Sequence, residues 1–184
     1  MNEPTTVLTD YALAAVSAFL GWKLVPRSKF WSLALIALAL GALLGGTWHG
    51  FWQSDVLWKA TTLAVGLASF GMVAGSASAA TAGKLRSALI GFAAGKLAAY
   101  SAWMLYHDDF IWVVVDTASA LLIVAALHLW RFNGWMLAGA AVSVLAGLMQ
   151  ASGFALHAHF NHNDLYHVIQ TAGIFCFYKG LKKG

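Results

Sequence analysis

The sequence predicts an all-α, polytopic membrane protein: a seven-transmembrane-helix bundle that forms one domain over residues 1–184. Two observations lead to this fold class. First, the chain is 60% hydrophobic and only 10% charged, which is more apolar than a soluble domain of 184 residues needs to be. Second, its apolar residues gather into seven segments, most of them close to the roughly 20 residues that cross a bilayer as a helix. A bundle follows in which segments adjacent in the chain run antiparallel.

The seven segments follow one another with few residues between them. They cover approximately residues 8–25, 29–50, 55–79, 84–106, 109–130, 134–156 and 163–178. The first is expected to be a true span rather than a cleaved signal peptide, because its positive residues Lys23, Arg27 and Lys29 follow the apolar run. No linker, low-complexity tract or internal repeat interrupts the series, so the sequence indicates a single domain.

The charged residues indicate how the bundle is oriented. Nine of the 11 basic residues fall on the side reached after each odd-numbered segment: Lys23, Arg27, Lys29, Lys84, Arg86, Arg131, Lys179, Lys182 and Lys183. Six of the 7 acidic residues fall on the opposite side: Glu3, Asp10, Asp55, Asp108, Asp109 and Asp164. Because cytoplasmic loops carry an excess of lysine and arginine, we predict the N-terminus outside and the C-terminus in the cytoplasm. The expected localisation is that of a multi-pass protein of the bacterial inner (plasma) membrane.

The same loops explain the net charge. A formal charge of +4 would suggest a nucleic-acid partner in a soluble protein, but here the basic residues lie in short loops between spans. We therefore expect membrane lipids, and no nucleic acid, as partners. The single cysteine, Cys176, lies in the last apolar segment, which excludes both an intrachain disulfide and a CxxC metal motif.

Glycines spaced four residues apart are expected to bring the helices together. Such GxxxG pairs let two backbones approach closely in lipid, where no hydrophobic effect drives helices to associate. Four pairs occur: Gly41 and Gly45, Gly46 and Gly50, Gly71 and Gly75, and Gly91 and Gly95.

Histidines gather on the predicted outer side. Six of the 7 lie there, and only His128 lies on the other side: the six are His49, His107, His157, His159, His162 and His167. A polar cluster that opens an apolar helix is costly in lipid, so it indicates a function. Histidine is the commonest metal ligand, and neutral imidazole suits zinc.

We predict a zinc (Zn2+) site between the second and seventh segments. His49 ends the second segment and His167 lies in the first or second turn of the seventh, so their depths agree to about a turn, roughly 5 Å. His162, at the start of the seventh segment, is the expected third ligand. Asp164 shares a helix face with His167, and together with Asn163 it is also suited to capping that helix.

The other histidines are expected to have ordinary surroundings. His107 and His128 are predicted at headgroup level as amphipathic residues, and His157 and His159 in a solvated loop.

Lys96 and Asp116 lie inside the fourth and fifth segments, where adjacent antiparallel helices would bring them together. The sequence leaves two interpretations open. They form a structural ion pair, or they belong to a proton or substrate path, a role that intramembrane charges often have.

Seven spans, a histidine that ends the second and a histidine motif that opens the seventh together resemble a superfamily of seven-helix membrane hydrolases. It includes alkaline ceramidases, adiponectin-receptor-like (progestin and adipoQ receptor) proteins and Per1-like proteins. In that family a Ser-x-x-x-His pattern ends the second span and His-x-x-x-His opens the seventh. His49 and His167 match histidines of these patterns. Gly45 stands in place of the serine and Asn163 in place of the first histidine of the pair, and Asp55 lies at the very start of the third span, where the family carries an aspartate deeper.

The resemblance implies a zinc-dependent membrane hydrolase that acts on a lipid amide or ester, as ceramidases do. Zinc would be held by His49, His162 and His167, and Asp55 or Asp164 would act as general base. The lipid substrate would enter between helices. The alternative is a non-catalytic protein of the same fold: a metal-binding or proton-linked transporter, or a receptor-like subunit. The sequence indicates neither the substrate nor the oligomeric state.

Overall fold

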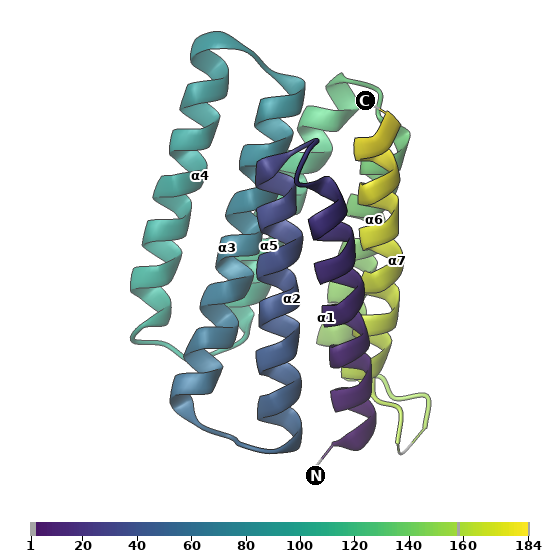
Figure 1. The fold of residues 1–184 in the computed structure, drawn as a ribbon. Helices are drawn as coiled ribbons and strands as arrows, with labels where there is room; N and C mark the ends of the chain where they lie inside the picture. Colours follow the sequence, from purple (N-terminus) through teal and green to yellow (C-terminus); the bar gives the residue numbers. More distant parts are fainter. Residues whose placement is uncertain (1–2, 158, 184) are drawn as a thin grey trace.

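The structure, a computed structural model, describes residues 3–157 and 159–183. All seven predicted helices are confirmed in these residues (Figure 1). They are α1 (Pro4–Leu24), α2 (Lys29–Gly50), α3 (Asp55–Ala80), α4 (Gly83–Met104), α5 (Ile111–Trp130), α6 (Gly134–Ser152) and α7 (His162–Lys183). Apart from one isolated bridge between His157 and Phe160, the described residues contain no β-structure.

Three helix ends differ from the prediction by more than two residues. α1 begins at Pro4 rather than near residue 8, since proline is well suited to the first turn of a helix. α6 ends at Ser152 rather than at 156, because Gly153 adopts φ 66°, the left-handed conformation that ends many helices. α7 continues to Lys183, past the expected end at 178.

Five helices are long and apolar enough to cross a membrane: α1, α2, α3, α5 and α6. The described chain is therefore a helical protein with the length and composition of a membrane-spanning one. The other two helices are more polar. α4 carries Lys84, Arg86 and Lys96, and α7 opens with the polar stretch from His162 to His167.

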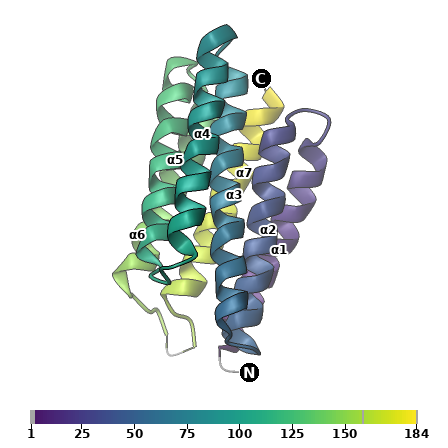
Figure 2. The ribbon, with the colours of Figure 1, turned by 90° about the vertical axis from the view of Figure 1, so that its left-hand side faces the viewer.

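Six of the helices form a closed ring, and α4 stands outside it. α1 packs against α2 and α7, α2 against α3, α3 against α5, and α6 against both α5 and α7. α4 packs mainly against α3 and lies outside the ring, as Figure 1 shows; Figure 2 gives the view from the side of α4. Because α4 crosses back outside the ring, α3 and α5 run parallel. The ring then closes between α1 and α7, which are also parallel, so both helices begin at the same end of the bundle.

Large side chains and glycines fill the interior together. The ring of Trp31 on α2 lies 5.0 Å from the ring of Phe177 on α7, and both side chains are buried. Gly71 on α3 touches α2 directly, since a Cβ there would lie 2.8 Å from the main-chain nitrogen of Ala34. The predicted packing role is confirmed for Gly71. It is wrong for Gly91 and Gly95 on α4, which face open space within the described chain.

The two ends of the bundle differ in charge. We call the end at which α1, α3, α5 and α7 begin the acidic end, and the opposite end the basic end. Lys59 is the exception at the acidic end. Its ammonium group pairs with Asp108 at 2.6 Å and donates hydrogen bonds to the carbonyl oxygens of Met104 (2.7 Å) and His107 (3.0 Å). It is thus neutralised while it caps the C-terminal end of α4.

We expect Gly71→Ala to destabilise the bundle by about 1–3 kcal/mol, because the new methyl group would meet main-chain atoms of α2 that cannot rotate away. Gly91→Ala is the matched control, since its Cβ would enter open space. Thermal unfolding in one detergent checks this. Equal melting temperatures for the Gly71→Ala and Gly91→Ala proteins would contradict the close α2–α3 contact.

Candidate functional site

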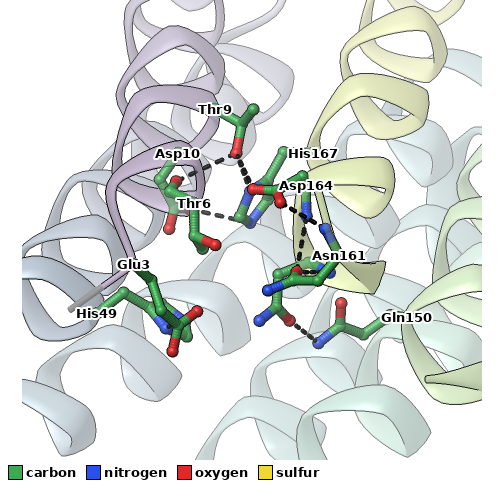
Figure 3. Close-up of polar contacts among 10 residues, drawn as sticks. Glu3, Thr6, Thr9, Asp10, His49, Gln150, Asn161, Asp164 and His167 are labelled. Atoms are coloured by element: carbon green, nitrogen blue, oxygen red, sulfur yellow. Dashed lines mark hydrogen bonds and ion pairs between the residues drawn. The ribbon is translucent and has the colours of Figure 1, made fainter. Parts of the chain in front are cut away.

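Three helices bring polar side chains together at the acidic end (Figure 3). α1 and α7 both begin there and α2 ends there, so residues near these termini lie at one level. The cluster consists of Glu3, Thr9, Asp10, His49, Asp164 and His167. Asp10, Asp164 and His167 are buried, with exposed fractions of 3%, 1% and 7%.

Glycines on α2 make room for Asp10. A Cβ on Gly46 would lie 2.8 Å from the Cβ of Asp10, so α1 and α2 are in contact at this point. A Cβ on Gly45 would lie 3.9 Å from both carboxylate oxygens of Asp10. The carboxylate therefore packs directly over Gly45, the residue that replaces the serine of the hydrolase pattern.

His167 is held at both ring nitrogens. Its Nε2 lies 3.0 Å from Oδ1 of Asp10, within ion-pairing distance. Its Nδ1 lies 3.0 Å from Oγ1 of Thr9. The same hydroxyl group lies 3.2 Å from Oδ1 of Asp164. Asp10, His167, Thr9 and Asp164 thus form one continuous polar chain between α1 and α7 (Figure 3).

The Thr9 hydroxyl has one proton and three acceptors within reach: the Thr6 carbonyl oxygen at 3.1 Å, Asp164 Oδ1 and His167 Nδ1. Two of these choices complete the series of polar contacts. When neutral His167 carries its proton on Nε2, facing Asp10, the Thr9 hydroxyl can donate to Nδ1. When the proton is on Nδ1, that nitrogen donates to Thr9, whose hydroxyl then donates to Asp164. The second arrangement leaves Nε2 with a lone pair, which is the form of histidine that binds a metal.

The start of α7 fixes Asp164. The Asn161 side-chain oxygen accepts hydrogen bonds from the main-chain N–H groups of Asn163 (2.8 Å) and Asp164 (3.4 Å). In return, Oδ2 of Asp164 accepts from the N–H of Asn161 at 2.7 Å. This reciprocal pattern is a capping box. The predicted capping role of Asp164 is confirmed, whereas the side chain of Asn163 instead accepts a hydrogen bond from Gln150 on α6 at 2.6 Å.

Glu3 and His49 form the second pair of the cluster. His49 Nδ1 lies 3.3 Å from Oε2 of Glu3, and the two side chains are 19% and 36% exposed. Both atoms are buried without a hydrogen-bond partner in the described chain, and so is Oδ2 of Asp10. Buried polar atoms normally have partners. Two of these three atoms face each other at 3.3 Å, so the cluster has room for further polar contacts chiefly at Oδ2 of Asp10 and between the two pairs.

The donor atoms suit a metal ion, but they are arranged as two pairs. Ligand atoms about 2.1 Å from a tetrahedral zinc ion lie about 3.4 Å from one another. The separations of 3.0 Å between His167 and Asp10 and 3.3 Å between His49 and Glu3 approach that value. Among residues 3–157 and 159–183, however, no three His, Cys, Asp or Glu side chains already have positions that could hold a metal. The two pairs would have to draw together around the ion.

The other predicted site residues lie outside these pairs. His162 is the first residue of α7 and is partly buried, and its side chain makes no hydrogen bond or ion pair within the described chain. Asp55 is the first residue of α3 and is exposed. It forms no hydrogen bond or ion pair with His49 or His167. Of the predicted residues, the structure gathers His49, His167 and Asp164.

Sequence reasoning missed the contribution of α1. The sequence predicted Glu3 and Asp10 only as acidic residues of the outer side, and it predicted no role for Thr9. Asp10 did carry a usable signal, because a carboxylate within an apolar span is costly unless it has a function. What the sequence did not contain was the neighbour: α1 and α7 are the two ends of the chain, and only the closed ring brings them together.

Elsewhere, the structure confirms the predicted contact between Lys96 and Asp116. The Lys96 ammonium group pairs with the Asp116 carboxylate at 2.5 Å and donates to the Asp116 carbonyl oxygen at 2.9 Å, which joins α4 to α5 as predicted. His107 stacks on Trp103, with ring centroids 3.8 Å apart. His128 lies in the last turn of α5, but its side chain is buried within the bundle rather than exposed. It is only 3% exposed and contacts Ser76 Oγ through Nε2 at 3.2 Å, because α3 covers it.

Comparison with known proteins gives one match. The model of a family described as "Family of unknown function (DUF6962)" matches residues 5–184. No curated protein and no solved structure matches the chain.

Replacing Thr9 with valine changes the side-chain volume little, but it should interrupt the series of polar contacts between His167 and Asp164. Two buried polar atoms would lose a partner, so we expect a loss of about 1–3 kcal/mol in the free energy of unfolding. Thr5→Val on the same helix is the control, since the Thr5 side chain makes no hydrogen bond within the described chain. Equal melting temperatures for the two variants in detergent would contradict the proposed hydrogen bonding.

Proposed function

The chain belongs to the DUF6962 family of unknown function, and from its buried site we propose that it is a zinc-dependent membrane hydrolase. The proposed substrate is a lipid with an amide or ester bond, as in the ceramidase-like proteins that the sequence resembles. The proposed metal site lies at the acidic end, between α1, α2 and α7.

One observation carries this proposal. Three buried atoms, Glu3 Oε2, Asp10 Oδ2 and His49 Nδ1, lack hydrogen-bond partners and belong to the cluster that also holds His167. Carboxylate oxygens and imidazole nitrogens are the ligands that zinc prefers when no thiolate is available. Leaving these atoms unsatisfied costs free energy, and a bound cation would recover it.

The residues can be given separate roles. His49, His167 and Asp10 are the proposed ligands, and Asp10 takes the place that we assigned to His162 from the sequence. Thr9 and Asp164 would hold the proton of His167 on Nδ1 and so keep Nε2 directed at the metal, as the outer partners of zinc-bound histidines do. A bound zinc ion would supply Lewis-acid activation of water and of the substrate carbonyl.

Glu3 is the proposed general base. It is the most exposed carboxylate of the cluster, with 36% of its side chain accessible, so it can exchange a proton with water. Asp164 is less suited to that role than we expected from the sequence, because it is 1% exposed and its two oxygens are already hydrogen-bonded. Asp55 is exposed on α3 and has no contact with His49 or His167.

The surroundings favour a lipid substrate. Both α1 and α2 have the composition of membrane spans. Beside the cluster, Leu8 on α1 is 69% exposed and Val168 on α7 is 54% exposed, so apolar surface flanks the site. A substrate with acyl chains could approach from the bilayer, whereas a soluble substrate would gain nothing from these side chains.

A second candidate function rests on the polar chain itself. The contacts from Asp10 through His167 and Thr9 to Asp164 could pass a proton between two carboxylates, which would suit a proton-linked transporter. Lys96 and Asp116 do not extend this path, because they pair with each other between α4 and α5.

We also propose the orientation that the charges favour, with all seven helices crossing the bacterial inner membrane and the acidic end outside. The basic residues lie at the opposite end, in agreement with the positive-inside rule.

Metal content tests the main proposal. We expect about one zinc ion per chain in protein purified in detergent and loaded with zinc, and little or none in His49→Ala, His167→Ala and Asp10→Asn. His107→Ala is the control, because His107 lies at the same end but stacks on Trp103. Zinc and chain concentrations are measured together after gel filtration, which also reports whether each variant is folded.

The outcomes separate the candidate functions. Folded wild-type protein that takes up no zinc would contradict the metal site. Zinc binding without zinc-dependent cleavage of fluorescent amide- and ester-linked lipids would contradict the hydrolase and favour the non-catalytic alternative.

Cysteine labelling tests the orientation. In a Cys176→Ala background, Ala155→Cys at the acidic end should react with a membrane-impermeant maleimide on intact cells, whereas Ala82→Cys at the basic end should react only after lysis. Both alanines are exposed, so accessibility within the fold is matched. The reverse labelling pattern would invert the proposed topology.

A further inference from the structure

A cavity of about 820 Å³ opens at the basic end, far from the histidine cluster. It lies between the α1–α2 connection, the end of α3, the α5–α6 connection and the end of α7. The proposed hydrolase has no use for it, because all of the groups given a role above lie at the acidic end. Its lining nevertheless has a consistent chemistry.

Positive charge lines the cavity without compensation. Arg27, Lys29 and Arg131 line it, and no aspartate or glutamate does. None of the three cations forms an ion pair with a carboxylate in the described chain. Six of the 7 acidic residues lie at the opposite end, and the seventh, Asp116, pairs with Lys96. A concave site with charges of one sign concentrates ions of the other sign.

Two helices also begin at the cavity. Ser28 caps α2, which starts at Lys29, and Asn133 caps α6, which starts at Gly134; all four residues line the cavity. Each cap side chain accepts a single main-chain N–H, from Trp31 at 3.4 Å and from Met136 at 3.3 Å. The first turn of a helix has up to four N–H groups without an intrahelical acceptor, and its dipole favours an anion.

A buried histidine points to a ligand independently of these charges. His128 lines the cavity and is only 3% exposed. Its Nε2 contacts Ser76, but its Nδ1 is buried without any partner in the described chain. When the Ser76 hydroxyl donates to Nε2, the proton of the neutral ring lies on Nδ1, which can then donate to an anion.

We propose that this cavity binds a phosphate group. Three cations, two helix N-termini and an imidazole donor suit a tetrahedral anion with several oxygens better than a monovalent ion. The cavity is also larger than one phosphate requires, so the phosphate can be part of a larger molecule. An anionic phospholipid headgroup and free inorganic phosphate share this chemistry.

Aromatic residues beside the cavity favour the lipid source. Phe132 lines the cavity and is 89% exposed, and Trp130, two residues before it in the chain, is 82% exposed. Exposed aromatic side chains at the end of a spanning helix usually lie at headgroup level. Basic pockets between helices at that level bind anionic headgroups.

The test measures binding to the full-length protein in a neutral detergent. The probes are phosphatidylglycerol, diacylglycerol as a lipid without phosphate, and inorganic phosphate, each titrated by native mass spectrometry or calorimetry. Phosphatidylglycerol should bind and diacylglycerol should not. If millimolar inorganic phosphate does not displace the lipid, the source is the headgroup; if phosphate binds alone and displaces it, the source is the free anion.

Variants that each remove one positive charge test whether the probe binds in the cavity. Arg131→Gln and Lys29→Gln should each weaken binding of the phosphate-bearing probe about tenfold, because each removes a charge-assisted hydrogen bond. Arg86→Gln is the matched control. It removes the same charge at the same end, but Arg86 lies outside the cavity and its side chain is bonded to the Thr81 carbonyl oxygen at 2.8 and 3.0 Å. Equal losses in all three variants, or no binding of either phosphate-bearing probe to the wild type, would overturn the proposal.

Discussion

The contact between α1 and α7 assembles the polar cluster at the acidic end, and the proposed site depends on it. These helices come from the two ends of the sequence, and they run parallel because α4 crosses back outside the ring. Their contact places Asp10 and His167 3.0 Å apart, with both side chains buried. In such an environment a lone carboxylate or imidazole is costly, so each stabilises the other there. The same contact brings Thr9 to Asp164 and so completes the polar chain.

Close helix approach and buried polar groups depend on one another here. Asp10 can lie against α2 only because Gly45 and Gly46 have no side chains, and α7 begins at the required level because its capping box fixes the first turn. The same principle applies in the apolar core, where Gly71 brings α3 against the backbone of α2. Small residues thus position the larger ones, because a helix without a side chain at the contact lets its neighbour approach closely.

The two ends of the bundle have opposite chemistry, and each has a group of atoms left unsatisfied. At the acidic end these atoms are carboxylate oxygens and an imidazole nitrogen, which suit a cation. At the basic end they include His128 Nδ1, beside arginines and a lysine that suit an anion. Lys59 and Lys96 show the contrast. Each is a cation away from the basic end, and each is paired with an aspartate.

The sequence by itself determined the helices, because an apolar run of about 20 residues in a membrane has few alternatives to a helix. It also determined the separation of charges between the ends, and the contact of Lys96 with Asp116, since antiparallel neighbours in sequence meet at matching depth. For the site it identified His49, His167 and Asp164. It could not identify Asp10, Thr9 or Glu3 as their partners, and it did not predict that α3 covers His128. Those outcomes depend on which helices are neighbours in the ring and on which face each helix turns inward. Only the tertiary structure decided them, because helices separated in the chain meet through packing, which local sequence patterns do not encode.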